Sequence, residues 1–116
     1  MRPEHKHAYK RGDIVYVNIG ETTGSEQSGK RPAVIVSNNK ANTHSPVLIV
    51  VYLTTKKKNP LPTHARVMCI KPSIALCEEP TSVDISRIGE PFKTCTKKEM
   101  EEIDLALGIA LGLKEC

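Results

Sequence analysis

The chain has 116 residues, the size of one domain with a modest hydrophobic core of its own. Apolar residues make up 39% of it but aromatic residues only 3%, so Val, Ile, Leu and Ala must build the core, and broad aromatic platforms for stacking bases are excluded. The formal net charge of +4 favours a polyanionic partner.

The cysteines and the apolar runs exclude several classes of protein. The four cysteines contain no C-x-x-C pair, and an even count without a signal peptide does not imply disulfides, so we expect free thiols, no metal site and no cofactor. No run approaches the ~20 apolar residues of a membrane span, and the basic N-terminus lacks the apolar segment of a signal peptide. We therefore expect a cytoplasmic protein.

The first half of the chain predicts strands around one long loop. Residues 1–10 show no periodicity and predict a flexible tail. Residues 13–19 and 32–37 have β-type patterns, and the polar stretch 38–45 predicts a turn or a short helix. Residues 47–53 form a continuous apolar run, which is typical of a central buried strand.

Three shorter β segments follow, separated by the turn-forming pairs Lys71-Pro72 and Glu79-Pro80. These segments cover residues 64–70, 73–77 and 82–88. Six short strands at close spacing predict a small, strongly bent sheet or barrel. We therefore predict a mainly β fold that forms a single domain over residues 11–114.

The pattern then changes to a helical period. Thr96 and Glu99 form the capping box T-x-x-E, and the apolar residues after it recur at helical spacing. The apolar face is wider than one small sheet should cover, which predicts a homodimer. Its positions are Met100, Ile103, Leu107 and Leu111, widened by Leu105 and Ile109.

A glycine-bracketed polar loop leads into the second predicted strand. Residues 24–32 read G-S-E-Q-S-G-K-R-P and bring Lys30 and Arg31 to the point where a loop meets a rigid scaffold, a position that tends to carry function. The loop nearly matches the phosphate-binding motif G-x-x-x-x-G-K-[ST]. However, Arg31 replaces the hydroxyl that would hold magnesium, and Pro32 and a strand follow in place of a helix. A nucleotide-binding loop is therefore rejected.

Taken together, these segments resemble the MazF/PemK-type toxins, which are endoribonucleases (mRNA interferases) of bacterial type II toxin–antitoxin systems. The resemblance runs from about residue 10 to residue 113 and preserves the order of the elements. It is carried by R-G-D-I-V at 11–15, G-S-E-Q at 24–27, R-P at 31–32, V-I-V-S-N at 34–38, S-P at 45–46, Thr54, L-P-T-H at 61–64 and Glu78.

The resemblance implies an SH3-like barrel that forms a homodimer, cuts single-stranded RNA at short preferred sequences without a metal, and is inhibited by a partner antitoxin. It places the catalytic arginine on Arg31 and the catalytic threonine on Thr54. After Glu78 the chain departs from the family pattern, with Glu79-Pro80-Thr81, which leaves the base preference open. The RNA-lining positions implied are Ser25, Glu26, Gln27 and Glu78.

Metal-free cleavage of RNA requires a fixed positive group where negative charge develops on the phosphate. The Arg31 guanidinium stays protonated and can donate two parallel hydrogen bonds, and the Thr54 hydroxyl can donate another. Arginine is a poor base, so proton transfer stays open between Glu26, Glu78 and His64. The alternatives without a catalytic role are a surface salt bridge for Arg31 and, for His64, a ring whose nitrogens form hydrogen bonds with the backbone.

Lysines near Thr54 and Arg31 are expected to attract the RNA backbone. Lys56, Lys57 and Lys58 follow Thr54 directly and predict non-specific phosphate attraction, and Lys30 lies next to Arg31. The competing function is a non-catalytic SH3-like module that binds RNA or an antitoxin. The Arg31 and Thr54 pair favours the enzyme.

Overall fold

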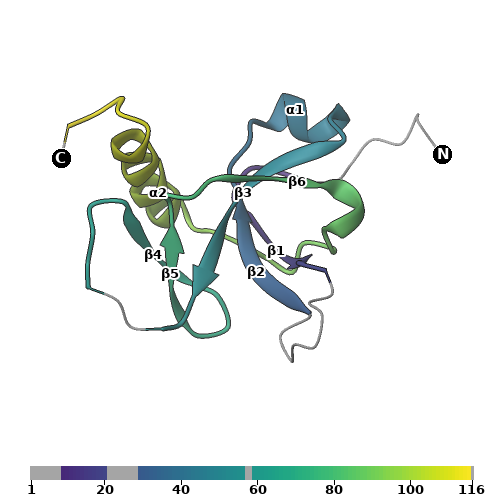
Figure 1. Cartoon of the computed structure of the whole chain (residues 1–116), viewed down its shortest axis with the longest axis horizontal. Coiled ribbons are helices and arrows are strands. Elements are labelled where there is room, and N and C mark those ends of the chain that lie inside the picture. The colour runs from purple at the N-terminus through teal and green to yellow at the C-terminus, as the bar shows by residue number, and fades with distance from the viewer. Residues whose placement is uncertain (1–8, 21–28, 57–58, 116) are drawn as a thin grey trace.

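The computed structural model describes residues 9–20, 29–56 and 59–115, which form a curled half-barrel of strands with one helix packed at its end (Figure 1). This confirms the predicted mainly β fold with a C-terminal helix. The elements are β1 (Asp13–Asn18), β2 (Lys30–Ile35), α1 (Asn39–His44), β3 (Val47–Thr54), β4 (His64–Met68), β5 (Pro72–Leu76), β6 (Thr81–Asp84), the 3-10 helix η1 (Ile85–Arg87), β7 (Lys93–Thr94) and α2 (Lys97–Ala110).

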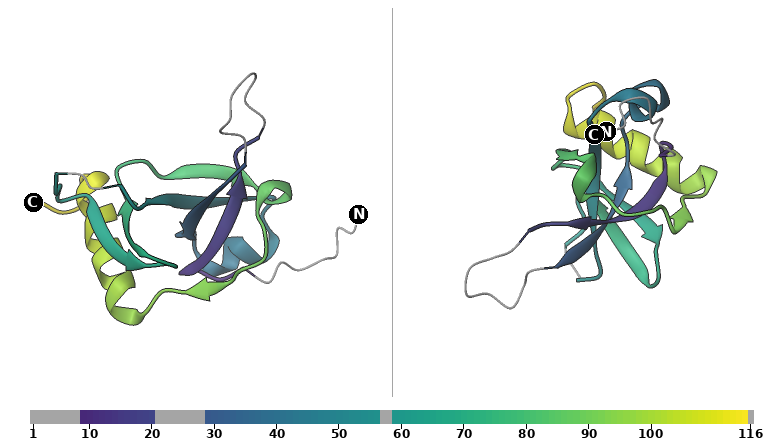
Figure 2. Two further views of the ribbon diagram at one scale, coloured as in Figure 1. Left: turned by 90° about the horizontal axis from the view of Figure 1, so that it is seen from below. Right: turned by 90° about the vertical axis from the view of Figure 1, so that its right-hand side faces the viewer.

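β3 is the centre of the sheet because it changes partners along its length. The strand order is β4-β5-β3-β2-β1-β7, and all of the pairings are antiparallel. Val47–Val50 pair with β6, whereas Leu53 and Thr54 pair with β5. This change of partner bends the sheet around its own core, so that the strands curl in Figure 2.

The buried side chains of the central strands divide between two apolar cores, whereas Val47 and Ile49 at the start of β3 are 42% and 40% exposed. One face packs against β4, β5 and α2 through residues such as Ile14, Val34 and Val51. The other face closes over β6 and η1 and includes Val17 and Val50. Buried neighbours along these strands, such as Val50 and Val51, therefore enter two different cores, which favours apolar residues at consecutive positions.

Several boundaries differ from those that the sequence predicts. The strand expected over residues 82–88 ends at Asp84, because the Asp84 carboxylate accepts the Ser86 N–H at 2.8 Å and caps η1. The short strand β7, which the sequence did not predict, pairs with the start of β1. Tyr9, at the end of the expected tail, donates its hydroxyl to the Ile88 carbonyl at 2.9 Å, while residues 1–8 lie outside the described residues.

The capping box of α2 is present as predicted. Thr96 Oγ1 accepts the Glu99 N–H at 3.0 Å, and Glu99 Oε1 accepts the Thr96 N–H at 2.8 Å. Ile103 is fully buried, whereas Leu105 and Leu111 are 51% and 61% exposed, so one predicted apolar face covers the core and another faces outward. Within the described part of the chain, no helix is long and apolar enough to cross a membrane.

The described cysteines are buried free thiols in the core beside α2. Cys69, Cys77 and Cys95 form no disulfide with one another. Burial raises the pKa of Cys77 and of Cys95 to about 12, and the nearby carboxylates Glu78 and Glu99 add to this effect. The thiols of Cys77 and Cys95 therefore stay protonated at neutral pH.

Candidate active site

Arg31 and Thr54 line the same cavity at the open end of the half-barrel. Ala33 pairs with Tyr52, and continuing this register by two residues sets Arg31 across from Thr54. The cavity has a volume of about 650 Å³ and lies between the ends of β2, β3 and β5. Gly29, just before β2, has a φ of 138°, which favours glycine and lets the loop turn into the strand at this point.

The Arg31 guanidinium lies on an aromatic ring and forms no ion pair with a described carboxylate. Its Cζ lies 4.8 Å from the centroid of the Tyr52 ring. Among the described residues it takes part in neither of the ion pairs, which join Arg11 to Asp104 and His64 to Glu78, and it has no hydrogen-bond partner. The surface salt bridge considered for Arg31 is therefore not formed there. A cation on an aromatic face keeps its N–H groups free for an anion.

Thr54 is also oriented within this cavity. Its Oγ1 accepts the backbone N–H of Lys56 at 3.1 Å, which leaves the hydroxyl proton free to be donated. Lys30 and Lys56 line the cavity as well, and the described lining includes no carboxylate. Three cations around one hollow, with no carboxylate among its described lining residues, form a site suited to a phosphate group.

Glu78 does not line this cavity but lies beside it, paired with His64. Thr63 donates its hydroxyl to Glu78 Oε1 at 3.2 Å, and His64 Nε2 lies 3.3 Å from Glu78 Oε2. The His64 side chain is only 8% exposed, and its Nδ1 has no partner among the described residues. The backbone-satisfied histidine that the sequence suggested is therefore wrong, because a carboxylate holds one ring nitrogen and the other is left unpaired.

The register places this pair on the same sheet face as Thr54. Thr54 pairs with Ile74 across β3 and β5, and His64 pairs with Leu76 across β5 and β4. Side chains two residues apart on a strand share a face, so Thr54, Ile74, Leu76 and His64 form one continuous surface. Here His64, Ile74 and neighbouring residues line a second cavity of about 350 Å³. The sequence analysis missed it, although the motif L-P-T-H at 61–64 contributes to its wall.

The remaining predicted site residues lie outside the described residues. These are Ser25, Glu26 and Gln27 of the glycine-bracketed loop, together with Lys57 and Lys58. Within the described residues, no group of three or more His, Cys, Asp or Glu side chains could hold a metal ion.

Comparison with known proteins assigns the family. A model of the PemK-like, MazF-like toxins of type II toxin–antitoxin systems matches residues 10–111. The chain belongs to this family. It is 34% identical to the Endoribonuclease MazF of Staphylococcus saprophyticus over 110 residues. The alignment covers 90% of this chain and 92% of that relative. The MazF/PemK-type endoribonuclease toxin that the sequence predicted is thus confirmed.

Solved structures of similar chains agree with this toxin's fold. An endoribonuclease in complex with its cognate antitoxin, from a mycobacterial species, superposes with a TM-score of 0.79 at 26% identity, covering 94% of this chain and 100% of that chain. A MazE–MazF structure from Deinococcus radiodurans gives a TM-score of 0.79 at 23% identity, covering 93% of this chain and 99% of that chain, and supports the fold alone.

Proposed function

We propose that this toxin cuts single-stranded RNA at short preferred sequences through attack of a ribose 2′-hydroxyl on the adjacent phosphorus, without a metal ion. The 2′-oxygen–phosphorus bond forms as the phosphorus–5′-oxygen bond breaks. A proton leaves the 2′-hydroxyl and a proton reaches the departing 5′-oxygen, so the products are a 2′,3′-cyclic phosphate and a 5′-hydroxyl. The observation that supports this proposal is that Arg31 and Thr54 line one cavity whose described lining lacks carboxylates.

Arg31 stabilises the charge that develops on the non-bridging phosphate oxygens. Its guanidinium is planar and always protonated, so two parallel N–H donors can meet two oxygens of the five-coordinate transition state. The Tyr52 ring, whose centroid lies 4.8 Å from Arg31 Cζ, limits where the guanidinium can move. An aromatic face competes only weakly with phosphate oxygens for the guanidinium N–H groups. Thr54, fixed through Lys56 N, donates to the same phosphate.

Proton transfer requires a group other than Arg31, and the three candidate residues are Glu26, His64 and Glu78. Glu78 and His64 form a hydrogen-bonded pair next to the cavity, and Glu26 lies in the loop before it. The pH profiles of kcat for Glu26→Gln, Glu78→Gln and His64→Gln distinguish them. The variant that lacks the base loses the acidic limb of the profile, whereas a variant that only loses binding keeps the shape and raises KM.

We also propose that the toxin binds an acidic and apolar segment of a cognate antitoxin. The mycobacterial relative was solved in complex with its cognate antitoxin, and here Lys30, Arg31 and Lys56 form a basic rim that an acidic segment would complement. Covering this rim would exclude RNA. The adjacent gene's product should therefore bind the toxin and suppress cleavage, and an antitoxin that bound without inhibiting would contradict this arrangement.

A homodimer is proposed from the apolar surface on the opposite side of β3. A cavity of about 590 Å³ lies between α2 and β3 and is lined by Val36, Ile49 and Leu111, among others. Ile49 is 40% exposed and Leu113 is 76% exposed, which leaves contiguous apolar area around the cavity uncovered in a single chain. A second copy of the chain, with the same apolar surface, covers it.

The deciding experiment uses the purified wild-type protein and a mixture of RNA sequences, in the presence of EDTA. Cleavage should persist, and the ends should be 2′,3′-cyclic phosphate and 5′-hydroxyl. Sequencing of the 5′ ends then gives the preferred sequence. Loss of cleavage on chelation would overturn the metal-free mechanism, and tight RNA binding without cleavage would favour the non-catalytic module.

A further inference from the structure

A fourth hollow, distinct from the three described above, lies beside the end of β1 and shares one cation with the active-site cavity. It has a volume of about 210 Å³ and is lined by Tyr16, Asn18, Lys30, Ser86, Arg87, Ile88 and Gly89. Lys30 also lines the cavity that holds Arg31 and Thr54. The two hollows are therefore neighbours, separated by the side chain of Lys30.

Backbone pairing fixes Arg87 in this hollow. Ile88 forms a bridge with Val17, and the Gly89 N–H donates to the Tyr16 carbonyl at 2.9 Å, so the segment after η1 runs along the edge of β1. Arg87 Nε donates to the Asn18 carbonyl at 2.8 Å. Asn18 itself pairs with Lys30. The backbones of Arg87 and Lys30 therefore lie on either side of β1, two strand spacings or about 10 Å apart. Both side chains are long enough to reach one small anion bound between them.

The charge of Arg87 is available to a ligand. Among the described residues, no carboxylate lies within ion-pair distance of its guanidinium, and Nε is the nitrogen that has a partner. Asp84 is nearby, but its carboxylate accepts the Ser86 N–H at 2.8 Å. That hydrogen bond, together with Arg87, holds the pKa of Asp84 below its usual value. The terminal guanidinium nitrogens of Arg87 and the ammonium of Lys30 remain as donors for oxygen atoms.

We propose that Lys30 and Arg87 form a second phosphate subsite, which binds the RNA backbone phosphate next to the one that is cut. The proposal rests on the proposed function and deepens it, because it adds Arg87 to the RNA site. Consecutive phosphates of one strand must occupy neighbouring cationic hollows when the chain passes through the active site. A bound flanking phosphate holds the strand on both sides of the scissile bond, which aligns the 2′-oxygen with the phosphorus.

The test is a coupling experiment between one protein charge and one phosphate charge. The probe is an oligonucleotide that contains the preferred sequence with a 2′-deoxy residue at the cleavage position, so that it binds but cannot be cut. In a series of such probes, a neutral methylphosphonate replaces one phosphate at a time. Affinity of wild type and of Arg87→Gln is measured for each probe.

Wild type should bind about tenfold more weakly when the flanking phosphate is neutral, which is typical of losing a hydrogen-bonded ion contact. Arg87→Gln should bind the unmodified probe about tenfold more weakly, and at that one position it should lose less than wild type does on neutralisation, because only Lys30 still contacts the phosphate. Its log–log salt slope should fall by about 0.7. Arg87→Lys keeps the charge and should keep most of the slope.

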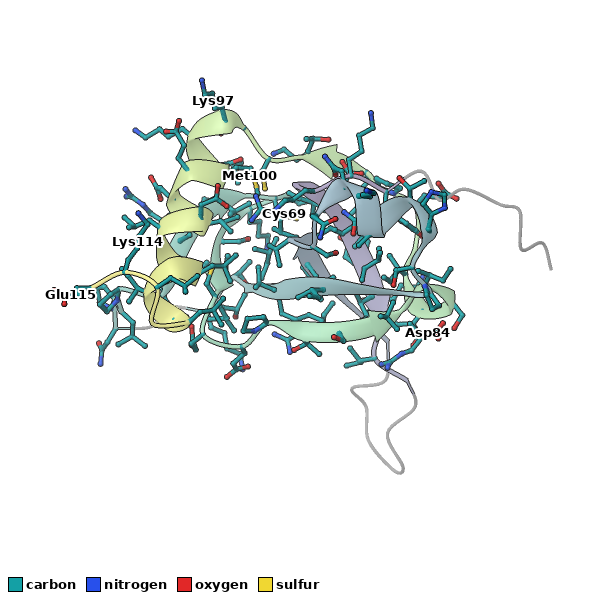
Figure 3. The ribbon with its side chains drawn as sticks, turned by 90° about the horizontal axis from the view of Figure 1, so that it is seen from above. Cys69, Asp84, Lys97, Met100, Lys114 and Glu115 are labelled. Carbon is teal, nitrogen blue, oxygen red and sulfur yellow. The ribbon has the colours of Figure 1, made fainter. Side chains whose placement is uncertain are left out.

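Lys97→Gln is the matched control, because it removes the same charge from the start of α2. Figure 3 shows Lys97 and Asp84, which precedes η1, at opposite ends of the molecule. This variant should bind every probe as wild type does. Thermal melting of each variant separates a folding defect from a binding defect.

The possible failures can be told apart. Equal losses for Arg87→Gln at every probe position, without coupling at one of them, would overturn the subsite while leaving the proposed function intact. The same conclusion follows if Lys97→Gln weakens binding as much as Arg87→Gln. A wild-type protein that neither binds nor cuts RNA would overturn the proposed function and the subsite together.

Discussion

Replacing Arg31 by alanine should separate turnover from binding and folding. The guanidinium has no ion-pair or hydrogen-bond partner among the described residues, so its folded-state contribution is mainly the contact with the Tyr52 ring at 4.8 Å. A cation–π contact at a partly exposed site contributes about 0.5–1 kcal/mol. For a domain of this size, that loss lowers Tm by only about 2–5 °C.

The expected effect on the reaction is much larger. Removing one donor that meets charge developing in the transition state lowers kcat by about 10²–10³, or about 2.7–4 kcal/mol. Because the charge on the phosphate grows most in the transition state, the affinity for uncleavable RNA should fall by less than this factor. Arg31→Lys should also be impaired, since an ammonium keeps the charge but lacks the planar pair of donors.

The assay is single-turnover cleavage of a short fluorescent RNA, with the affinity for a 2′-deoxy probe and Tm measured on the same preparations. Lys30→Ala is the matched comparison in the same cavity, and it should weaken binding with a smaller effect on the chemical step. Folded Arg31→Ala that cuts at the wild-type rate would refute the role given to Arg31. A loss confined to affinity would show that Arg31 binds RNA without stabilising the transition state.

Four further outcomes test other parts of the structure. Thr54→Val should lower kcat by about tenfold or more while Tm stays close to wild type, because the β-branched shape is kept and only the hydroxyl is lost; unchanged kcat would remove Thr54 from the mechanism. Lys56→Gln should flatten the salt dependence of RNA binding by about 0.7 in log–log slope, and an unchanged slope would show that this lysine does not meet the backbone. Leu111→Glu should shift the mass in light scattering from dimer to monomer at micromolar concentration, whereas a wild type that is already monomeric would contradict the dimer. Burial raises the pKa of Cys77 and of Cys95 to about 12, so an alkylating reagent should label both slowly at pH 8.5 in the native protein. Labelling should be rapid in the unfolded protein, where the thiol pKa returns to about 8.5. Peptide mapping that finds equal labelling rates in the two states would show that these cysteines are not buried.

Local signals in the sequence were enough to find most elements. The capping box at Thr96 and Glu99 forms as expected because it needs only residues three apart on the chain. The apolar run in β3 and the polar stretch that forms α1 were recognised for the same reason. The end of β6 at Asp84 was missed because the cap that its carboxylate forms on η1 has no distinctive sequence pattern. The strand β7 was missed because a strand of two residues is too short to show a periodic pattern.

The sequence by itself determined the family and the mainly β class and singled out Arg31 and Thr54 as the predicted catalytic pair, because short motifs around strand ends hold this information locally. Only the tertiary structure decided which of these groups meet. The register between β2 and β3 sets Arg31 opposite Thr54, and the pairing of β4 with β5 brings His64 within 3.3 Å of Glu78. Arg87 joined Lys30 through the bridge between Ile88 and Val17. Such contacts join residues far apart in the chain, and their geometry depends on how the sheet curls around its two cores, which no local pattern encodes.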